Sequence, residues 1–80
     1  MIISVEISMY ALKDHYKAPI QAFIESLGQH PQLKLTYSAM STSIVGDFMD
    51  IMPILNQEIH ASLRTLPESV FVIKLSGGCH

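Results

Sequence analysis

The stretch IISVEISMY, residues 2–10, is the clearest structural signal in this sequence and decides its fold. Apolar and polar residues alternate along it, which is the pattern of a β-strand with one face in a core and one face outside it. The apolar face consists of Ile3, Val5, Ile7 and Met9. We therefore expect a half-buried strand over residues 2–10, and the rest of the chain has to cover its apolar face.

Five further elements are predicted after this strand. Apolar residues at helical spacing predict two helices, and renewed alternation predicts three more strands. The helices are expected from residue 15 or 16 to 27 and over 50–66, and the strands over 33–38, 41–45 and 69–75. This order predicts an α+β fold, the ferredoxin-like βαββαβ sandwich, with a four-stranded antiparallel sheet that carries both helices on one face.

The start of the second helix has two readings. Asp50 is the expected N-cap, because it would place Pro53 in the first turn, where a backbone N–H has no helical partner to lose. With Asp47 as the cap instead, the helix would contain Pro53 in its interior and bend there. In either reading the two aspartates are expected to cap the helix and complement its dipole, rather than to bind a metal ion.

Length and composition indicate one small domain that associates with a partner. The chain has 80 residues, so we expect a single domain over residues 1–76 and a short C-terminal tail over 77–80. A domain of this size buries only about 60% of its unfolded surface. Hydrophobic residues make up 49% of the chain and charged residues 15%, below the roughly 25% of a typical soluble domain. Some apolar surface is therefore expected to be buried in an oligomer.

Several classes of protein do not fit this sequence. The formal net charge of −2 and the scattered lysines argue against a nucleic-acid partner, which would require a basic surface. Cys79 is the sole cysteine, so no internal disulfide can form and a reducing cytoplasm is the expected compartment. Glu6 interrupts the first apolar run too early for a signal peptide, and no membrane span is expected, because no apolar run approaches the ~18 residues needed.

The sheet face that the helices leave uncovered is predicted to combine polar groups with apolar ones. Alternation places Glu6, Ser8 and Tyr10 on this face of the first strand, and Ser41 and Ser43 on the same face of the third. The first and third strands are central in this topology. A carboxylate and several hydroxyls are thus expected in the middle of the uncovered face.

The last strand carries apolar residues on both faces over residues 70–75, which is typical of strands that are covered on both sides. With helices on one side only, the sheet of an identical subunit is the simplest second cover. Two such faces would enclose a shallow cavity with polar groups in apolar walls, which suits a small-molecule ligand.

Sites for other chemistry are not expected. The four histidines lack the spacing of a zinc site, so no metal is predicted. No phosphate-binding loop or Ser-His-Asp order is present, and we expect a protein that is not an enzyme. An acylphosphatase on this fold would need an arginine near the first loop, whereas Arg64 lies near the end of the second predicted helix.

Three stretches resemble the YkoF-like thiamine-binding proteins, which are small ferredoxin-like domains. Residues 7–12 (ISMYAL) resemble that family's strand-ending segment, residues 40–42 (MST) its central hairpin, and residues 46–52 (GDFMDIM) its Gly-Asp-x-x-Asp-Val-Phe helix entry. The chain departs from the family at Ala11, where proline is frequent, and it ends soon after the fourth strand. Because some relatives carry two such domains, the resemblance implies self-association for a single copy.

The resemblance implies thiamine or its hydroxymethylpyrimidine half as the ligand, with no other cofactor. A carboxylate at Glu6 could bind an aminopyrimidine through charge-assisted hydrogen bonds, with hydroxyls completing its edge and an aromatic ring near the thiazolium cation. The candidate ligand-binding residues are Glu6, Ser8, Tyr10, Tyr37, Ser41 and Ser43. The alternative is that Glu6 is a solvated strand carboxylate and that the serines are small residues that let two sheets approach.

Two functions follow from these readings. The first is non-enzymatic binding of thiamine or a related hydroxymethylpyrimidine between the sheets of a homo-oligomer, a dimer or a tetramer. The second is a regulatory or assembly domain that oligomerises through its uncovered sheet face without a small-molecule ligand.

Overall fold

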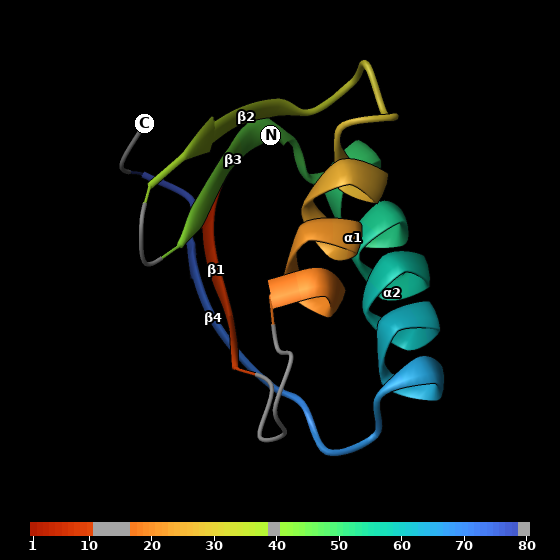
Figure 1. Ribbon diagram of the computed structural model, residues 1–80. Coiled ribbons are helices and arrows are strands. Elements are labelled where there is room, and N and C mark those ends of the chain that lie inside the picture. The colour runs from red at the N-terminus through yellow and green to blue at the C-terminus, as the bar shows by residue number, and fades with distance from the viewer. Residues whose placement is uncertain (11–16, 39–40, 79–80) are drawn as a thin grey trace.

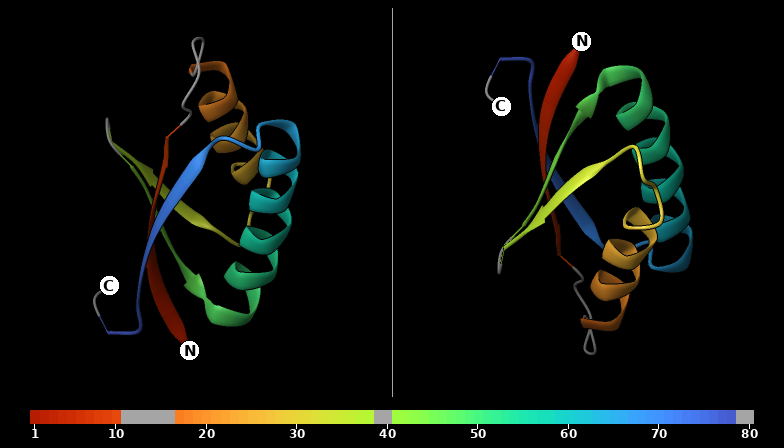
Figure 2. Two further views of the ribbon diagram at one scale, coloured as in Figure 1. Left: turned by 90° about the horizontal axis from the view of Figure 1, so that it is seen from below. Right: turned by 90° about the horizontal axis from the view of Figure 1, so that it is seen from above.

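A computed structural model describes residues 1–10, 17–38 and 41–78. They form the strands β1 (Ile2–Tyr10), β2 (Lys34–Tyr37), β3 (Thr42–Asp47) and β4 (Val70–Ser76), and the helices α1 (Lys17–Leu27) and α2 (Phe48–Thr65). The sheet has the order β2-β3-β1-β4 with antiparallel pairing throughout. Both helices lie on one face of the sheet (Figure 1; Figure 2). The predicted ferredoxin-like α+β fold is confirmed.

Strand β1 is one of the two central strands of the sheet. It pairs with β3 on one side and with β4 on the other. Its alternating pattern produces alternating burial, and its apolar residues pack against residues from both helices. The buried apolar core consists of Ile3, Val5, Ile7, Phe23, Leu27, Leu33, Ile44, Ile51 and Leu55.

Close packing of α2 on the sheet depends on a glycine in β3. A Cβ atom at Gly46 would lie 3.3 Å from Cδ1 of Ile51 and 3.4 Å from the carbonyl oxygen of Gln32. Such contacts are tighter than ordinary van der Waals distances. Gly46 therefore allows the first turns of α2 to approach the sheet, where Ile51 is completely buried.

The predicted start of the second helix is wrong, and the alternative start is confirmed. Asp47 is the N-cap: its backbone is extended, and the N–H of Met49 donates to its Oδ2 at 3.0 Å. Asp50 lies within the first turn, and Pro53 lies inside the helix. The cost of an internal proline was overestimated, since the cap and the apolar contacts of α2 offset the one hydrogen bond that Pro53 cannot donate.

The other predicted bounds need smaller changes. β3 begins one residue later and extends to Asp47, because Gly46 and Asp47 pair with the start of β1. β2 is shorter than predicted, and β4 is displaced by one residue toward the C-terminus. The predicted first turn of the first helix, at residues 15 and 16, lies outside the described residues.

Asp47 should make the stability of the domain depend on pH. The hydrogen bond from the Met1 amino group and the one from the backbone N–H of Met49 hold the pKa of Asp47 below its usual value of 3.8. A lowered pKa in the folded state stabilises the protein above 3.8, and this stabilisation is lost as the pH falls through the lowered value.

We therefore predict that Asp47→Asn, which retains a capping side chain but no charge, slightly lowers the melting temperature at pH 7, because the ion pair that it removes is exposed. The difference from the wild type should disappear in acid, because protonation then removes the charge of Asp47 as well. Thermal unfolding followed by circular dichroism between pH 2 and 7 measures this. If the melting temperatures of the two proteins differ by the same amount at every pH, the charge of Asp47 does not stabilise the fold.

Candidate functional site

The candidate site lies on the sheet face opposite the helices, which we call the open face. The pairing register determines its members, because directly opposite residues of antiparallel strands share a face. The open face consists of Ile2, Ser4, Glu6, Ser8 and Tyr10 of β1, Lys34 and Thr36 of β2, Ser43, Val45 and Asp47 of β3, and Val70, Val72, Lys74 and Ser76 of β4.

A polar row crosses the middle of this face. Thr36 pairs with Ser43, Ser43 with Glu6, and Glu6 with Lys74, so one residue of each strand contributes to the row. The row borders a hollow of about 420 Å³ whose lining includes Ser4, Glu6, Ser43 and Lys74. The side chain of Glu6 is 48% exposed in the single chain. The carboxylate is thus accessible to a ligand.

Four of the six predicted ligand-binding residues lie together on the open face. Glu6, Ser8 and Tyr10 lie on the same side of β1, and Ser43 is directly opposite Glu6. Tyr10 is at the far end of this series, opposite Val70, and both side chains are about half exposed. Glu6 and Ser43 form the centre of the predicted set, and Ser8 and Tyr10 extend it toward the apolar end of β4.

The structure does not bring Tyr37 and Ser41 to this site. Tyr37 is directly opposite Thr42, which is buried beneath the helices, so Tyr37 belongs to the helix side of the sheet. Ser41 precedes β3, where its hydroxyl lies 3.3 Å from that of Ser38, and it lines a small cavity on the helix side together with Phe23. The expectation that Ser41 faces outward assumed that β3 begins at Ser41, whereas the strand begins at Thr42.

Lys74 is the main residue of the site that the sequence did not reveal. Its Nζ lies 3.7 Å from Oε1 of Glu6, and the two residues are directly opposite in β4 and β1. Ser4 and Ser76 line the same hollow. The alternation of β4 could have indicated that Lys74 shares a face with Val72, but it could not show which residue of β1 lies opposite.

Strand β4 exposes apolar side chains on both faces. On the open face Val70 and Val72 are each about half exposed, and on the helix side Ile73 and Leu75 are equally exposed, because the helices do not extend over this edge. Phe71 does reach the core, and its ring centroid lies 5.0 Å from that of Phe23. The open face therefore has a polar centre and an apolar border along β4.

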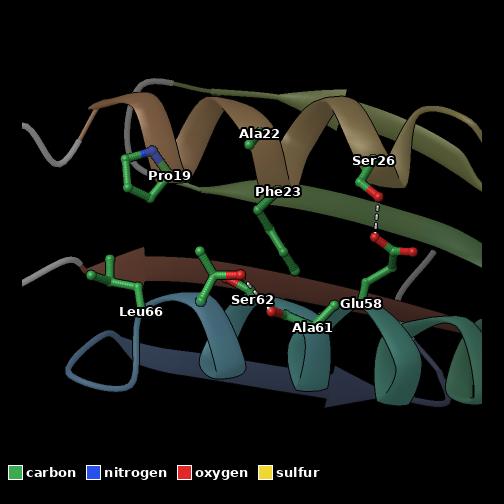
Figure 3. Close-up of a pocket in the computed structure, with 9 residues that line it drawn as sticks. Pro19, Ala22, Phe23, Ser26, Glu58, Ala61, Ser62 and Leu66 are labelled. Atoms are coloured by element: carbon green, nitrogen blue, oxygen red, sulfur yellow. Dashed lines mark hydrogen bonds between the residues drawn. The ribbon is translucent and has the colours of Figure 1, made fainter.

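A second cavity, of about 200 Å³, lies between the two helices (Figure 3). Phe23 lies in this groove, and Glu58 stands at one end of it, hydrogen bonded by the hydroxyl of Ser26. Nε2 of His30 lies 3.4 Å from Oε1 of Glu58, whose side chain is only 11% exposed. The carboxylate of Glu58 thus contacts both Ser26 and His30. This cluster links α1, the segment that follows α1, and α2, and we interpret its role as structural.

Two general properties bear on the function. The described ranges hold no group of three or more histidine, cysteine, aspartate or glutamate side chains placed to bind a metal ion. In the same part of the chain, neither helix is long and apolar enough to cross a membrane.

Comparison with known proteins identifies the fold. The sequence matches no protein-family model and no curated protein. Among solved structures, protein SP2199 of Streptococcus pneumoniae is similar with a TM-score of 0.89 and 18% identity, over 99% of this chain and 89% of that chain. At these identities the likeness establishes a shared fold.

Two further structures are similar to this one. TM0486 of Thermotoga maritima, named as a candidate thiamine biosynthesis or salvage protein, has a TM-score of 0.83 and 15% identity, over 95% of this chain and 83% of its own. A domain of unknown function, DUF77, from Bacillus cereus has a TM-score of 0.74 and 20% identity, over 95% of this chain and 75% of its own. At these identities the two likenesses again show a shared fold.

Proposed function

We propose that this protein is a YkoF-like binding protein that holds thiamine or a related hydroxymethylpyrimidine on its open face, between the sheets of a homo-oligomer. In this proposal the protein binds the ligand and does not catalyse a reaction of it. The observation that carries the proposal is the polar row centred on Glu6 and Ser43, within the hollow of about 420 Å³. The name of the Thermotoga maritima neighbour supports the choice of ligand. The cytoplasm is the compartment in which we place this activity.

The chemistry of the row fits an aminopyrimidine. Such a ring offers an exocyclic amine as donor and ring nitrogens as acceptors. The carboxylate of Glu6 can accept from the amine, and the hydroxyl of Ser43, directly opposite, can donate to a ring nitrogen. Hydrogen bonds to a charged partner contribute about 1.5–3 kcal/mol each. One pyrimidine edge thus finds a matching acceptor and donor on neighbouring central strands.

A second subunit would complete the site. The hollow lies on an uncovered sheet face, whereas small-molecule sites usually bury most of the ligand surface. The half-exposed Val70 and Val72 lie on the open face of β4, beyond Lys74 and opposite Tyr10 and Ser8, and offer apolar surface for a facing sheet. Packing of two open faces would enclose the ligand and cover these side chains at the same time.

A second candidate function is assembly without a ligand. The observation that favours it is the apolar surface of β4, which is exposed on the helix side as well as on the open face. Such an edge can associate with another chain whether or not a small molecule is present. The two functions differ in whether the polar row binds a small molecule.

Isothermal titration calorimetry with thiamine and with hydroxymethylpyrimidine tests the proposal. We expect the wild type to bind at least one of these ligands and Glu6→Gln to bind it at least ~10-fold more weakly, because the amide cannot offer a charged acceptor. Glu25→Gln, which changes an exposed carboxylate on α1, is the matched control and should bind like the wild type. Chromatography of the recovered ligand should show it unchanged.

The two candidate functions predict different results in this titration. An oligomer that gives no binding heat with either ligand would overturn the binding function and favour the assembly function. If the wild type and Glu6→Gln bind the ligand with equal affinity, Glu6 does not contribute to ligand binding.

A further inference from the structure

We propose that the open face prefers a phosphorylated pyrimidine, the phosphate monoester of hydroxymethylpyrimidine, and that Lys74 is the residue that determines this preference. The inference rests on the proposed function, since it takes the polar row to be the pyrimidine site. The charges around Glu6 are the reason for choosing the phosphorylated compound among the possible pyrimidine ligands.

The first step is that Glu6 is not an isolated negative charge. Nζ of Lys74 lies 3.7 Å from Oε1 of Glu6. The ammonium group compensates much of the attraction that the carboxylate alone would exert on a cation. An ion pair of this kind, with side chains 48% and 76% exposed, contributes little to stability and can separate at low cost. A ligand that offers one group to each partner can therefore replace it.

The second step is the charge of the whole open face. By the pairing register it carries two lysines, Lys34 and Lys74, and two carboxylates, Glu6 and Asp47. Asp47 stands at the end of the sheet, where the Met1 amino group, 3.0 Å away, balances its charge. An excess of positive charge on a partly enclosed face attracts anions and disfavours a ligand that is a cation.

The third step is the geometry of the ligand. In hydroxymethylpyrimidine the amine and the hydroxymethyl group are on adjacent ring carbons, so a phosphate ester of that hydroxyl lies beside the amine. Glu6 and Lys74 are likewise neighbours, directly opposite on adjacent strands. With the amine on Glu6, the phosphate falls next to Lys74, while Ser4 and Ser76 line the same hollow.

Thiamine presents the opposite charge at this position. Its cationic thiazolium ring is attached through the carbon that bears the hydroxyl in hydroxymethylpyrimidine. With the amine on Glu6, the ammonium of Lys74 would face a like charge, which weakens binding. We therefore expect the affinity to decrease from the phosphate ester to hydroxymethylpyrimidine and then to thiamine.

The test compares the three ligands by isothermal titration calorimetry with the wild type, Lys74→Met and Lys34→Met. Methionine retains an apolar stem but removes the charge. Lys34→Met is the matched control, because Lys34 is the other lysine of the open face and lies on the opposite edge strand. Circular dichroism and gel filtration verify that each variant has the fold and assembly of the wild type.

The wild type should bind the phosphate ester at least ~10-fold more tightly than hydroxymethylpyrimidine, as expected for one added charge-assisted contact. Lys74→Met should reduce this ratio to about 2 and improve the binding of thiamine, because the repelling charge is gone, whereas Lys34→Met should retain most of the preference. The preference of the wild type should also decrease with added salt.

Other outcomes would overturn the inference. Equal wild-type affinities for the two pyrimidines would do so, even if Lys74→Met failed to fold, and the proposed function would survive. If Lys74→Met still prefers the phosphate ester over hydroxymethylpyrimidine as strongly as the wild type, only the role of Lys74 is refuted. Absence of binding to all three ligands would overturn the proposed function and, with it, this inference.

Discussion

Substitution of Val72 by Asp should convert the proposed homo-oligomer into monomers. Val72 lies on the open face of β4, directly opposite Ser8, and is 46% exposed in the single chain. If two open faces pack together, the substitution places an unpaired carboxylate in each half of the interface. Burying such a charge costs several kcal/mol, and every copy of the chain contributes one.

Analytical ultracentrifugation over a range of protein concentrations measures this effect. We expect the dissociation constant of the oligomer to rise by at least ~100-fold, which corresponds to about 2.7 kcal/mol. Gln57→Asp, an equal change at an exposed position of α2, is the matched control and should retain the wild-type assembly. Ligand affinity should decrease together with assembly, because the second sheet is needed to enclose the hollow.

The same experiment can disprove the packing of open faces. A wild type that remains monomeric at high concentration would do so, as would a Val72→Asp variant that assembles like the wild type. In the second case, the exposed Ile73 and Leu75 on the helix side would be the next surface to change.

Truncation of Ile51 should have the largest effect on stability. Ile51 is completely buried, packs into the core of the sheet and contacts the position of Gly46. Ile51→Ala leaves a cavity and is expected to lower the free energy of unfolding by about 2–5 kcal/mol. The total stability of a small domain is about 5–15 kcal/mol, so this loss could leave much of the protein unfolded at 37 °C.

Met49→Ala is the matched control in the same helix, because Met49 is 73% exposed. It should change the free energy of unfolding by less than about 0.5 kcal/mol. Urea unfolding followed by circular dichroism compares the two variants with the wild type. Equal midpoints for Ile51→Ala and Met49→Ala would mean that α2 does not pack on the sheet as described here.

The elements that the sequence predicted best are those whose signal is local. β1 has the bounds that alternation predicts, Ile2–Tyr10, because the period of two is repeated over the whole strand. The N-cap of α2 was harder to predict, since Asp47 and Asp50 are both good caps and their ranking depends on the tertiary contacts that offset an internal proline. Local rules alone could not weigh these contacts.

The candidate site divides in the same way. Glu6, Ser8 and Ser43 were each predicted from the alternation of side chains within one strand, and the structure shows that Ser43 is directly opposite Glu6. Tyr37 was proposed as an aromatic neighbour for the thiazolium, although alternation groups it with Leu33 and Leu35, and its pairing with the buried Thr42 places it on the helix side. The position of Lys74 beside Glu6 depends on the register between the two ends of the chain.

Sequence alone thus determined the order of the elements, the apolar face of β1 and the polar groups on its other face, because these follow from the repeat of side chains along a single segment. Only the tertiary structure decided which residues of different strands are neighbours, which edge stays uncovered and which charges meet on the open face. The physical reason is that register between distant strands is set by the packing of the whole core, and a shift by one residue would reverse the face of every side chain in the strand.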